Sequence, residues 1–363
     1  MRPGRGRQQH VRMLAGASQR QERYMHISGV QTVLPDHRYE QAEITEAFSR
    51  LTDCDEEQLR RFHAATGVQG RNLALQLADY TKLDSFAKAN TTYAEIALDL
   101  GEQALRGALD KAGVRPEKVD HLLFCSTTGV ATPSIDARLA QRMGLRPDVK
   151  RVPVFGLGCA AGAAGLSRLY DYLRGWPDHV AALVCVELCS LTIQRDDTSI
   201  ANLVASGLFG DGAAAVVATG RGRGPEVVAT RSRLYPGTEH LMGWEVGDHG
   251  FRIVLDADLT AFVEQVLGAD IRAFLADYGL TPDQVATWIC HPGGPKVIDK
   301  IVETLGLNPR ALEVTWRSLR EYGNLSSVSV LHVLQETRGR AGAPALLMAL
   351  GPGFSAELLL LHW

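Results

Sequence analysis

The sequence lacks the features that mark several large classes of protein. It has 38 Lys and Arg against 41 Asp and Glu, which gives a formal net charge of −3. So small a charge favours neither a nucleic-acid coat nor a polybasic membrane anchor. No apolar run reaches the roughly 18–20 residues that span a bilayer. We therefore expect neither a nucleic-acid partner nor a membrane span.

Motifs for metals, nucleotides and secretion are also missing. The six cysteines include no CxxC pair and no metal-finger spacing. Cysteines scattered in this way are typical of reduced thiols in a cytoplasmic enzyme. No Walker A loop is present. We expect no metal and no resident cofactor.

The start of the chain is rich in Arg, Gln and Gly and lacks the apolar segment of a secretory signal. We predict that residues 1–24 form a disordered tail and that the fold begins at Met25. Hydrophobic residues make up 45% of the sequence and charged residues 22%, which are ordinary values for a globular protein with a substantial core.

One cysteine stands in an unusual setting. Cys159 lies within VFGLGCAAGAAG, where apolar residues lead in, glycines flank the thiol and a helix is expected over Ala160–Leu173. This order predicts a tight strand-to-helix turn. The free N–H groups and the positive dipole end of a helix start favour a thiolate. A neighbouring glycine lets the backbone approach a bulky substrate. Cys159 is therefore a candidate nucleophile.

The two halves of the chain repeat one pattern of elements. A helix over Ala94–Lys111 precedes a strand over Val119–Cys125, and a helix over Leu259–Ala276 precedes a strand over Val285–His291. The second strand follows the first by 166 positions. This duplication of alternating helices and strands predicts layered α/β structure built from two pseudo-twofold-related halves.

The halves meet near the Gly/Arg-rich turn Gly220–Pro225. We predict an N-terminal half over residues 25–222, which carries Cys159, and a C-terminal half over residues 223–363. Further strands are expected near residues 180–186, 213–218, 345–350 and 356–362.

The repeat brings three polar residues to equivalent places. Asn324 follows Cys159 by 165 positions, and both stand at the start of an apolar helix. His291 ends a predicted strand, and strand ends and helix starts carry the sites of α/β folds. A cysteine beside a histidine attacks acyl groups, and Asn324 can orient the imidazole or donate to a thioester carbonyl or enolate. Each residue alone also fits a structural role, such as a helix cap for Asn324.

The motifs around these residues match a known family. The chain resembles type III polyketide synthases, the chalcone-synthase-like branch of the thiolase-fold condensing enzymes, from about Met25 to the C-terminus. This resemblance implies a thiolase-like layered αβαβα fold. The matching motifs are GLGCAAGAAGL around Cys159, LFGDGAAAVV at residues 208–217, CHPGGPKVID at residues 290–299, EYGNLSSVSVL at residues 321–331 and GPGFSAELLL at residues 351–360.

The resemblance implies a reaction sequence for the three polar residues. Cys159 would take an acyl group from coenzyme A. His291 and Asn324 would polarise malonyl-CoA, so that it loses CO2 and forms an enolate that attacks the acyl chain. Repeated extension and ring closure would follow without a carrier protein. The resemblance also implies acyl-CoA and malonyl-CoA as substrates, a homodimer and a cytoplasmic location.

A substrate cavity is also implied by the resemblance. Phe209 matches a gating phenylalanine between the coenzyme A tunnel and the cavity. Ile253 stands at the second gate, where the family pattern has phenylalanine, and Trp244 replaces a glycine of plant enzymes. Thr132 replaces a methionine that reaches into the partner subunit's cavity. The cavity positions taken together are Thr127, Thr132, Cys189, Thr192, Phe209, Trp244, Ile253, Ser326, Gly351, Pro352 and Gly353.

Coenzyme A needs cations for its phosphates. Arg60, Arg61 and Arg71 lie in QLRRFHAATGVQGR, where the family keeps basic residues at the mouth of the tunnel. We expect these three arginines to bind coenzyme A.

The departures from the plant pattern resemble bacterial alkylpyrone and alkylresorcinol synthases. Ile253 replaces an aromatic gate with an aliphatic wall, and each buried CH2 of an alkyl starter contributes roughly 0.8 kcal/mol. We therefore expect a long-chain fatty acyl starter and an alkylpyrone or alkylresorcinol product.

Three other functions use similar residues. A β-ketoacyl carrier-protein synthase III would perform a single condensation, although the HPGGP and GPG motifs argue against it. A cysteine acyl-CoA hydrolase would need water at the thioester, whereas small apolar residues surround Cys159. A non-catalytic acyl-CoA-binding relative would not need all three polar residues.

Overall fold

A single mixed sheet forms the centre of the molecule. The structure is a computed structural model that describes residues 25–363, so the predicted tail lies outside the described residues. Within this range the central sheet has nine strands in the order β11-β12-β13-β8-β1-β7-β6-β4-β5. Two small sheets, β2 with β3 and β9 with β10, accompany it.

The strands are short or medium in length and mostly buried. Their bounds are β1 Met25–Val33, β2 His37–Glu40, β3 Gly70–Leu73, β4 His121–Cys125, β5 Lys150–Val154, β6 Val180–Leu188, β7 Asp211–Thr219, β8 Glu226–Leu234, β9 Met242–Gly247, β10 Gly250–Leu255, β11 Thr287–Cys290, β12 Pro344–Gly351 and β13 Ser355–His362.

The helices range from a little over two turns to more than seven. Their bounds are α1 Gln41–Leu51, α2 Glu56–Ala65, α3 Phe86–Ala112, α4 Ile135–Met143, α5 Ala161–Gly175, α6 Ile200–Leu208, α7 Leu259–Ala276, α8 Pro295–Leu305, α9 Glu313–Tyr322 and α10 Ser327–Glu336.

The strand order repeats about the contact between β1 and β8. One set reads β4-β6-β7-β1 and the other reads β11-β12-β13-β8. In each set the first pair is parallel and the next two pairs are antiparallel. The strands β1 and β8 join the sets antiparallel at Met25 and Val227. The pseudo-twofold arrangement predicted from the repeat is therefore confirmed, although β5 has no counterpart in the described chain. The division at residue 222 stays a prediction, because the sheet continues from one half to the other.

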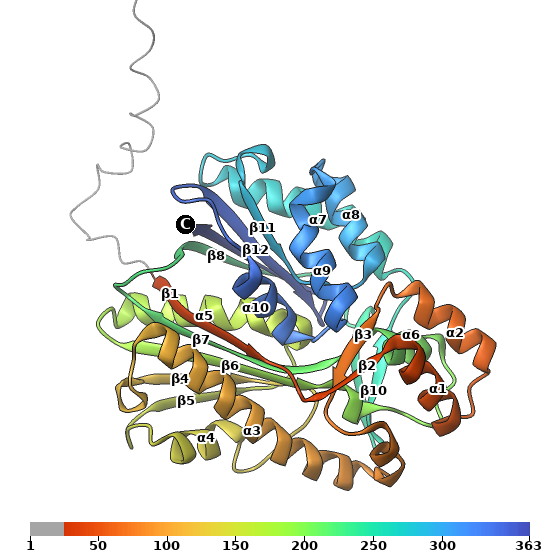
Figure 1. Ribbon diagram of the computed structural model, residues 1–363. Coiled ribbons are helices and arrows are strands. Elements are labelled where there is room, and N and C mark those ends of the chain that lie inside the picture. The colour runs from red at the N-terminus through yellow and green to blue at the C-terminus, as the bar shows by residue number, and fades with distance from the viewer. Residues whose placement is uncertain (1–24) are drawn as a thin grey trace, which may run out of the picture.

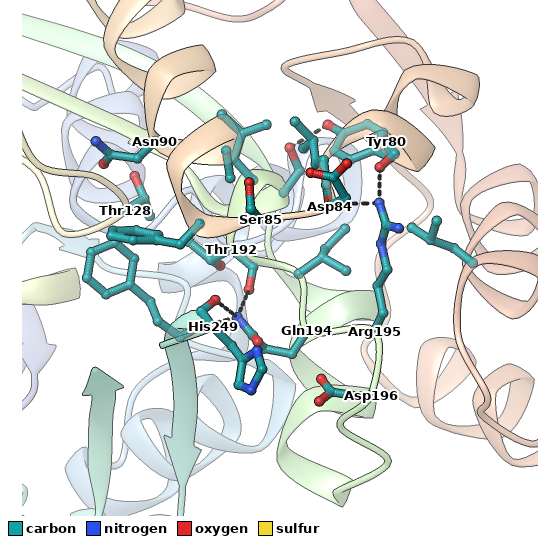
Figure 2. Close-up of a pocket in the computed structure, with 18 of the residues that line it drawn as sticks. Tyr80, Asp84, Ser85, Asn90, Thr128, Thr192, Gln194, Arg195, Asp196 and His249 are labelled. Atoms are coloured by element: carbon teal, nitrogen blue, oxygen red, sulfur yellow. Dashed lines mark hydrogen bonds between the residues drawn. The ribbon is translucent and has the colours of Figure 1, made fainter. Parts of the chain in front are cut away.

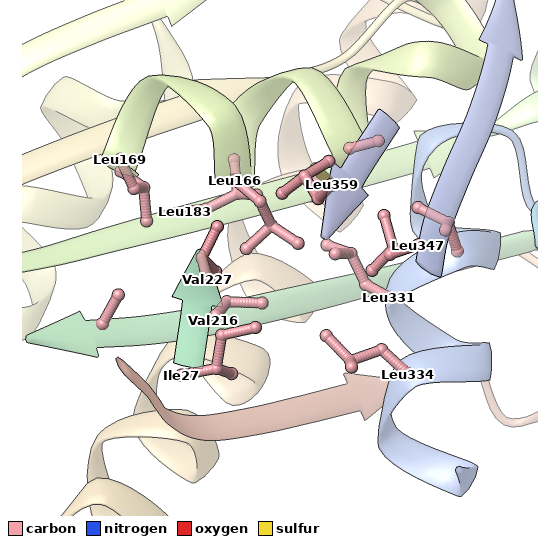
Figure 3. Close-up of a cluster of buried hydrophobic side chains, with 14 of the residues drawn as sticks. Ile27, Leu166, Leu169, Leu183, Val216, Val227, Leu331, Leu334, Leu347 and Leu359 are labelled. Carbon is pink, nitrogen blue, oxygen red and sulfur yellow. The ribbon is translucent and has the colours of Figure 1, made fainter. Parts of the chain in front are cut away.

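The helices complete a five-layered αβαβα arrangement (Figure 1). Helices α3 and α4 cover the outer face of the sheet around β4, β6 and β7, and α7 covers the outer face of the other set together with α8. Helices α5 and α10 lie between the two parts of the sheet. Figure 3 shows the buried cluster in this central layer, which includes Leu166 of α5, Leu331 of α10, Val216 of β7 and Leu347 of β12.

The predicted elements are present with shifted ends. Helix α7 has the predicted bounds, and α3 begins earlier than predicted because the Ser85 hydroxyl accepts a hydrogen bond from the Lys88 N–H and caps the helix at that point. Strand β4 begins only at His121, since the Val119 N–H closes a turn on the Pro116 carbonyl.

The closest approach of α5 and α10 depends on a glycine. A Cβ at Gly162 would lie 2.3 Å from the carbonyl oxygen of Ser327 and 2.7 Å from a methyl of Val330. A side chain there would push the two central helices apart. The glycine-rich motif after Cys159 therefore sets the distance between the two pseudo-equivalent helices.

We predict that Gly162→Ala lowers the free energy of unfolding by about 1–3 kcal/mol, the usual cost of overpacking a core. Gly175→Ala, at the other end of α5, is the matched control because a Cβ there meets nothing within 4 Å. It should leave stability unchanged or raise it by about 0.5–1 kcal/mol. Urea denaturation of both variants measures the difference, and equal effects would contradict the packing argument.

Candidate active site

Cys159 occupies a single tight turn, Gly158–Ala160, immediately before α5. Gly158 has a φ of 51°, and a Cβ on it would lie 2.6 Å from Cδ of Pro352. A Cβ on Gly351 would likewise lie 2.6 Å from Cβ of Ala160. The loop Gly351–Gly353 between β12 and β13 thus packs directly on the cysteine turn, and the glycines make that contact possible.

Asn324 and Ser326 reach the sulfur from the start of α10. The Cys159 Sγ lies 3.6 Å from the Ser326 Oγ, and hydrogen bonding from the Asn324 side chain also acts on this thiol. The Asn324 Oδ1 accepts from the Ser326 N–H at 2.8 Å. Ser326 is the one non-glycine residue of the described chain with a positive φ, at 50°. Such a conformation costs about 1–3 kcal/mol and is typical of functional turns.

His291 follows β11 and lies beside the same asparagine. The Asn324 Nδ2 donates to the Gly293 carbonyl at 3.3 Å, and a Cβ on Gly293 would lie 3.8 Å from the His291 Nε2. The imidazole is 5% exposed, and neither ring nitrogen has a hydrogen-bond partner among the described residues. The structure therefore brings Cys159, Asn324 and His291 to one place, as their positions in the repeat predict.

Burial keeps both members of the Cys–His pair neutral. The pKa of Cys159 is raised to about 12, chiefly by desolvation and also by the charge of nearby Glu187, while the hydrogen bond with Ser326 opposes the rise. Desolvation alone lowers the pKa of His291 to about 3. Burial therefore acts on the Cys159 pKa in the direction opposite to the thiolate expected at a helix start.

A buried carboxyl group lies behind the site, and the sequence reasoning missed it. Glu187 is fully buried in β6 and accepts hydrogen bonds from the Ser327 hydroxyl at 2.6 Å and from the Thr127 N–H at 3.1 Å. Ser326 reaches it at 3.4 Å. Burial raises the pKa of Glu187 to about 7 despite these bonds. An acidic residue in an otherwise apolar strand, VAALVCVEL, was the available signal.

Two adjoining cavities lie near these residues, although Cys159, His291 and Asn324 line neither. Phe209, in the wall of one, is bridged to Asn324, and Thr128, in the wall of the other, donates to Glu187. The smaller, of about 50 Å³, is lined by Cys189, Phe209, Trp244, Ile253 and Thr192 among others. Trp244 and Ile253 face each other across the β9–β10 pair. The larger cavity, of about 340 Å³, has polar and apolar groups in about equal share. Its polar lining includes Tyr80, Asp84, Asn90, Thr128, Gln194, Arg195 and His249 (Figure 2). Ser190, Thr192 and Ile193 line both cavities.

Comparison with known proteins decides the family. The N-terminal domain of chalcone and stilbene synthases matches residues 14–222, and the C-terminal domain of the same enzymes matches residues 226–363. The chain belongs to the chalcone and stilbene synthase family. It is a type III polyketide synthase, because solved structures of that class resemble it over 93% of its length.

Several relatives resemble this synthase over most of their length. A 1,3,6,8-tetrahydroxynaphthalene synthase of Streptomyces peucetius subsp. caesius is 54% identical over 93% of this chain and 93% of its own. A putative chalcone synthase of Bacillus subtilis is 35% identical over 82% of this chain and 86% of its own. The solved structure of the tetrahydroxynaphthalene synthase of Streptomyces coelicolor, a bacterial type III polyketide synthase, is 30% identical with a TM-score of 0.89 and covers 93% of this chain and 99% of that one.

The other expected cavity residues of the synthase have different surroundings. Thr127 is buried against Glu187, and Ser326 lies at the sulfur. Thr132 stands on an exposed loop, bound to Pro133 by a cis peptide, and does not line either cavity. That position agrees with a residue that would act outside its own chain's cavity.

The three arginines expected at a tunnel mouth separate into two groups. Arg60 and Arg61 are exposed on α2, where Arg60 pairs with Glu56. Arg71 is 2% exposed in β3, and its Nη1 donates to the Phe209 carbonyl at 2.5 Å. The expectation that Arg71 lies at the mouth of a tunnel is therefore wrong. Its place in β3, with strand-like burial on both faces, was not visible from the short polar motif around it.

Two further features of the synthase concern metal sites and membrane-spanning helices. Within residues 25–363 no group of three or more His, Cys, Asp or Glu side chains is arranged to hold a metal ion. No helix in the same range is both long and apolar enough to cross a membrane.

We predict that iodoacetamide alkylates Cys159 slowly at neutral pH and about tenfold faster for each unit of pH up to the stability limit of the protein. A pKa raised to about 12 leaves the thiol protonated throughout the neutral range, and only the thiolate reacts. Mass spectrometry of the Cys159 peptide gives the rate, and the same peptide in urea-unfolded protein is the control. A plateau near neutral pH in the folded protein would contradict the prediction.

Proposed function

We propose that this synthase loads a short starter from malonyl-CoA onto Cys159, extends it with further malonyl-CoA and releases 1,3,6,8-tetrahydroxynaphthalene. The observation that carries the proposal is the pair of adjoining cavities near the site, one small and the other lined about equally by polar and apolar groups. The 54% identical relative that makes this product supports it.

The chemistry of this product defines the substrates. A naphthalene skeleton has ten carbons, and its alternating oxygens are the pattern of a folded poly-β-ketone made from two-carbon units. Five malonyl-CoA molecules would give one tetrahydroxynaphthalene, five CO2, five coenzyme A and one water. No reductant or oxidant is needed, so the residues at Cys159 have only acyl transfer and carbon–carbon bond formation to catalyse.

Loading begins with the Cys159 thiol and the His291 imidazole both uncharged. The Cys159 sulfur attacks the thioester carbonyl while its proton passes to a ring nitrogen of His291, which is free to accept it because neither nitrogen has a partner in the described chain. The bond from the carbonyl carbon to the sulfur of coenzyme A then breaks, and the leaving thiolate takes the proton from the imidazole. Charge exists only during the transfer, which suits a site that excludes water.

Extension uses the same imidazole as a donor. A neutral imidazole has one N–H, which, with the Nδ2 of Asn324, would hold the thioester oxygen of malonyl-CoA as CO2 leaves and an enolate forms. The enolate carbon attacks the acyl group on Cys159, a carbon–carbon bond forms and the sulfur departs. A pKa of His291 lowered to about 3 supports this role, because a protonated imidazole would quench the enolate.

Cavity size favours the short starter over the long-chain acyl group expected from Ile253. Cavities that hold drug-sized ligands are about 300–1,000 Å³, so the 50 Å³ space beside Ile253 is too small for a long alkyl chain. Trp244, the cross-strand partner of Ile253, lines the same cavity and packs on Phe251 at a ring distance of 6.0 Å. The larger cavity has the volume, and carboxylate, amide and hydroxyl groups share its lining with apolar side chains, which suits an oxygen-rich polyketide better than an alkyl tail.

Two further expectations are carried into this proposal. Arg60 and Arg61 would bind coenzyme A phosphates from the exposed face of α2. A homodimer would form along the edge strand β5, where Val152 is 41% exposed and Phe155, just after the strand, is 49% exposed, and sedimentation equilibrium measures its mass. A cytoplasmic location stays a prediction.

We expect the purified synthase to form tetrahydroxynaphthalene from malonyl-CoA alone, measured by liquid chromatography and mass spectrometry of the products. Added palmitoyl-CoA should neither enter the product nor raise the rate of coenzyme A release. Palmitoyl-derived pyrones or resorcinols would favour the alkyl starter instead. A single β-ketoacyl product, or free fatty acid alone, would contradict both versions of the proposal.

Two substitutions separate loading from extension. Cys159→Ala should form no acyl-enzyme in intact-protein mass spectrometry. Asn324→Ala should still load an acyl group but release CO2 from malonyl-CoA about 100- to 1,000-fold more slowly, the usual loss for one donor to an oxyanion. Cys54→Ala, in a half-buried position away from the site, is the control. Normal decarboxylation by the Asn324 variant would overturn its assigned role.

A further inference from the structure

Arg71 is a buried cation whose hydrogen-bonding capacity is only partly used. Its Nη1 donates to the Phe209 carbonyl, but its Nε and Nη2 have no hydrogen-bond partner among the described residues. The side chain is 2% exposed. A buried guanidinium with unpaired donors costs several kcal/mol unless a ligand supplies the acceptor.

The two unpaired groups form one edge of the guanidinium. The N–H bonds of Nε and Nη2 run parallel on the side away from Nη1, and a carboxylate matches this edge with two hydrogen bonds. Burial lowers the pKa of Arg71 only to about 10, with Asp211 opposing the shift, so the group stays charged at neutral pH.

Asp211 is the acidic residue whose charge acts on Arg71, but its carboxylate oxygens accept hydrogen bonds from other groups. Its Oδ2 accepts from the Ala74 N–H at 2.6 Å and from the Ser190 hydroxyl, and its Oδ1 accepts from the Ser190 N–H at 2.8 Å. No hydrogen bond or ion pair joins it to Arg71 within residues 25–363. The Nε–Nη2 edge is therefore left for another anion.

Arg71 is well placed to meet a substrate. It lines the small cavity together with Phe209, Cys189 and Trp244. Its Cγ and Cδ lie against Gly323, where a Cβ would be 3.2 and 3.0 Å away, and Gly323 precedes the catalytic Asn324. The same backbone, Leu208 to Gly210, is hydrogen-bonded to Asn324 on one side and to Arg71 on the other.

We propose that Arg71 binds the carboxylate of a malonyl starter and thereby selects a short anionic acyl group for Cys159. The inference rests on the proposed function, since it names the charge of the starter. In the loading step the sulfur–carbon bond to Cys159 forms, the bond to coenzyme A breaks, the thiol proton leaves with coenzyme A, and the carboxylate stays intact on Arg71. A neutral acyl chain in the same cavity would leave the buried edge unpaired, and such sites reject analogues that lack the bonding group.

The test compares two acyl starters of similar size that differ in charge. Malonyl-CoA and 3-methylbutanoyl-CoA differ by a carboxylate against an isopropyl group. The rate at which each acylates Cys159, counting every acyl adduct, is followed by rapid quench and intact-protein mass spectrometry. The variants are Arg71→Met, which removes the edge, and Arg71→Lys, which keeps charge but not geometry. Arg106→Met, an exposed arginine paired with Glu102 on α3, is the control.

We expect the malonyl-to-methylbutanoyl rate ratio to fall about 10- to 100-fold in Arg71→Met, the usual loss for a charged hydrogen bond, with a smaller fall in Arg71→Lys. Arg106→Met should keep the wild-type ratio. A structural role alone, through the Phe209 carbonyl, would slow both starters equally and leave the ratio unchanged, which would overturn the inference. Wild-type product formation from malonyl-CoA alone is scored separately, so failure of the proposed function is seen without the variants.

Discussion

The contact between α5 and α10 is the constraint on which the site depends. These helices are equivalent in the two halves, and each is preceded by a turn that carries a residue of the proposed reaction, Cys159 in one and Asn324 in the other. Gly162 lets the helices approach until the Cys159 sulfur lies 3.6 Å from Ser326. Because the sheet continues through β1 and β8, the two turns cannot separate without breaking its centre. The duplication thus brings the two turns together. Because equivalent positions carry different residues, a thiol from Cys159 meets an amide from Asn324.

Removal of water decides the electrical state of the site. The thiol, the imidazole and Glu187 are all buried, and burial shifts the pKa of each toward its neutral form, with values of about 12, 3 and 7. At neutral pH the thiol and the imidazole are therefore uncharged before substrate arrives, whereas Glu187 is about half ionised. Formation of the enolate then creates charge where Asn324 and His291 can meet it, in surroundings that strengthen each hydrogen bond. Arg71 is the exception, a cation that stays charged beside the cavity.

The elements and the reacting residues were predictable for a common reason. Helix and strand periods, and the spacing of 165 to 166 residues, are local or repetitive signals, so they survive in the sequence and placed Cys159, His291 and Asn324 correctly. Properties that depend on three-dimensional burial were not predictable. In the sequence, Arg71 resembles one more basic residue of an exposed segment. Only the packing of β3 buries its side chain. Likewise the dipole argument for Cys159 left out desolvation, which raises the pKa of the thiol and depends on the three-dimensional packing around it.

The proposed malonyl starter illustrates why a single residue of the cavity wall is weak evidence for which acyl group the synthase accepts. Ile253 alone indicates an aliphatic wall, but its cross-strand partner Trp244 occupies the space that the smaller side chain would leave. The wall opposite then contains Arg71, and a charged, unpaired edge makes alkyl chains unfavourable neighbours whatever the shape of the cavity. Volume and charge therefore act in the same direction. A long alkyl starter would need both Trp244 to move and Arg71 to find another anion, whereas a malonyl group needs neither.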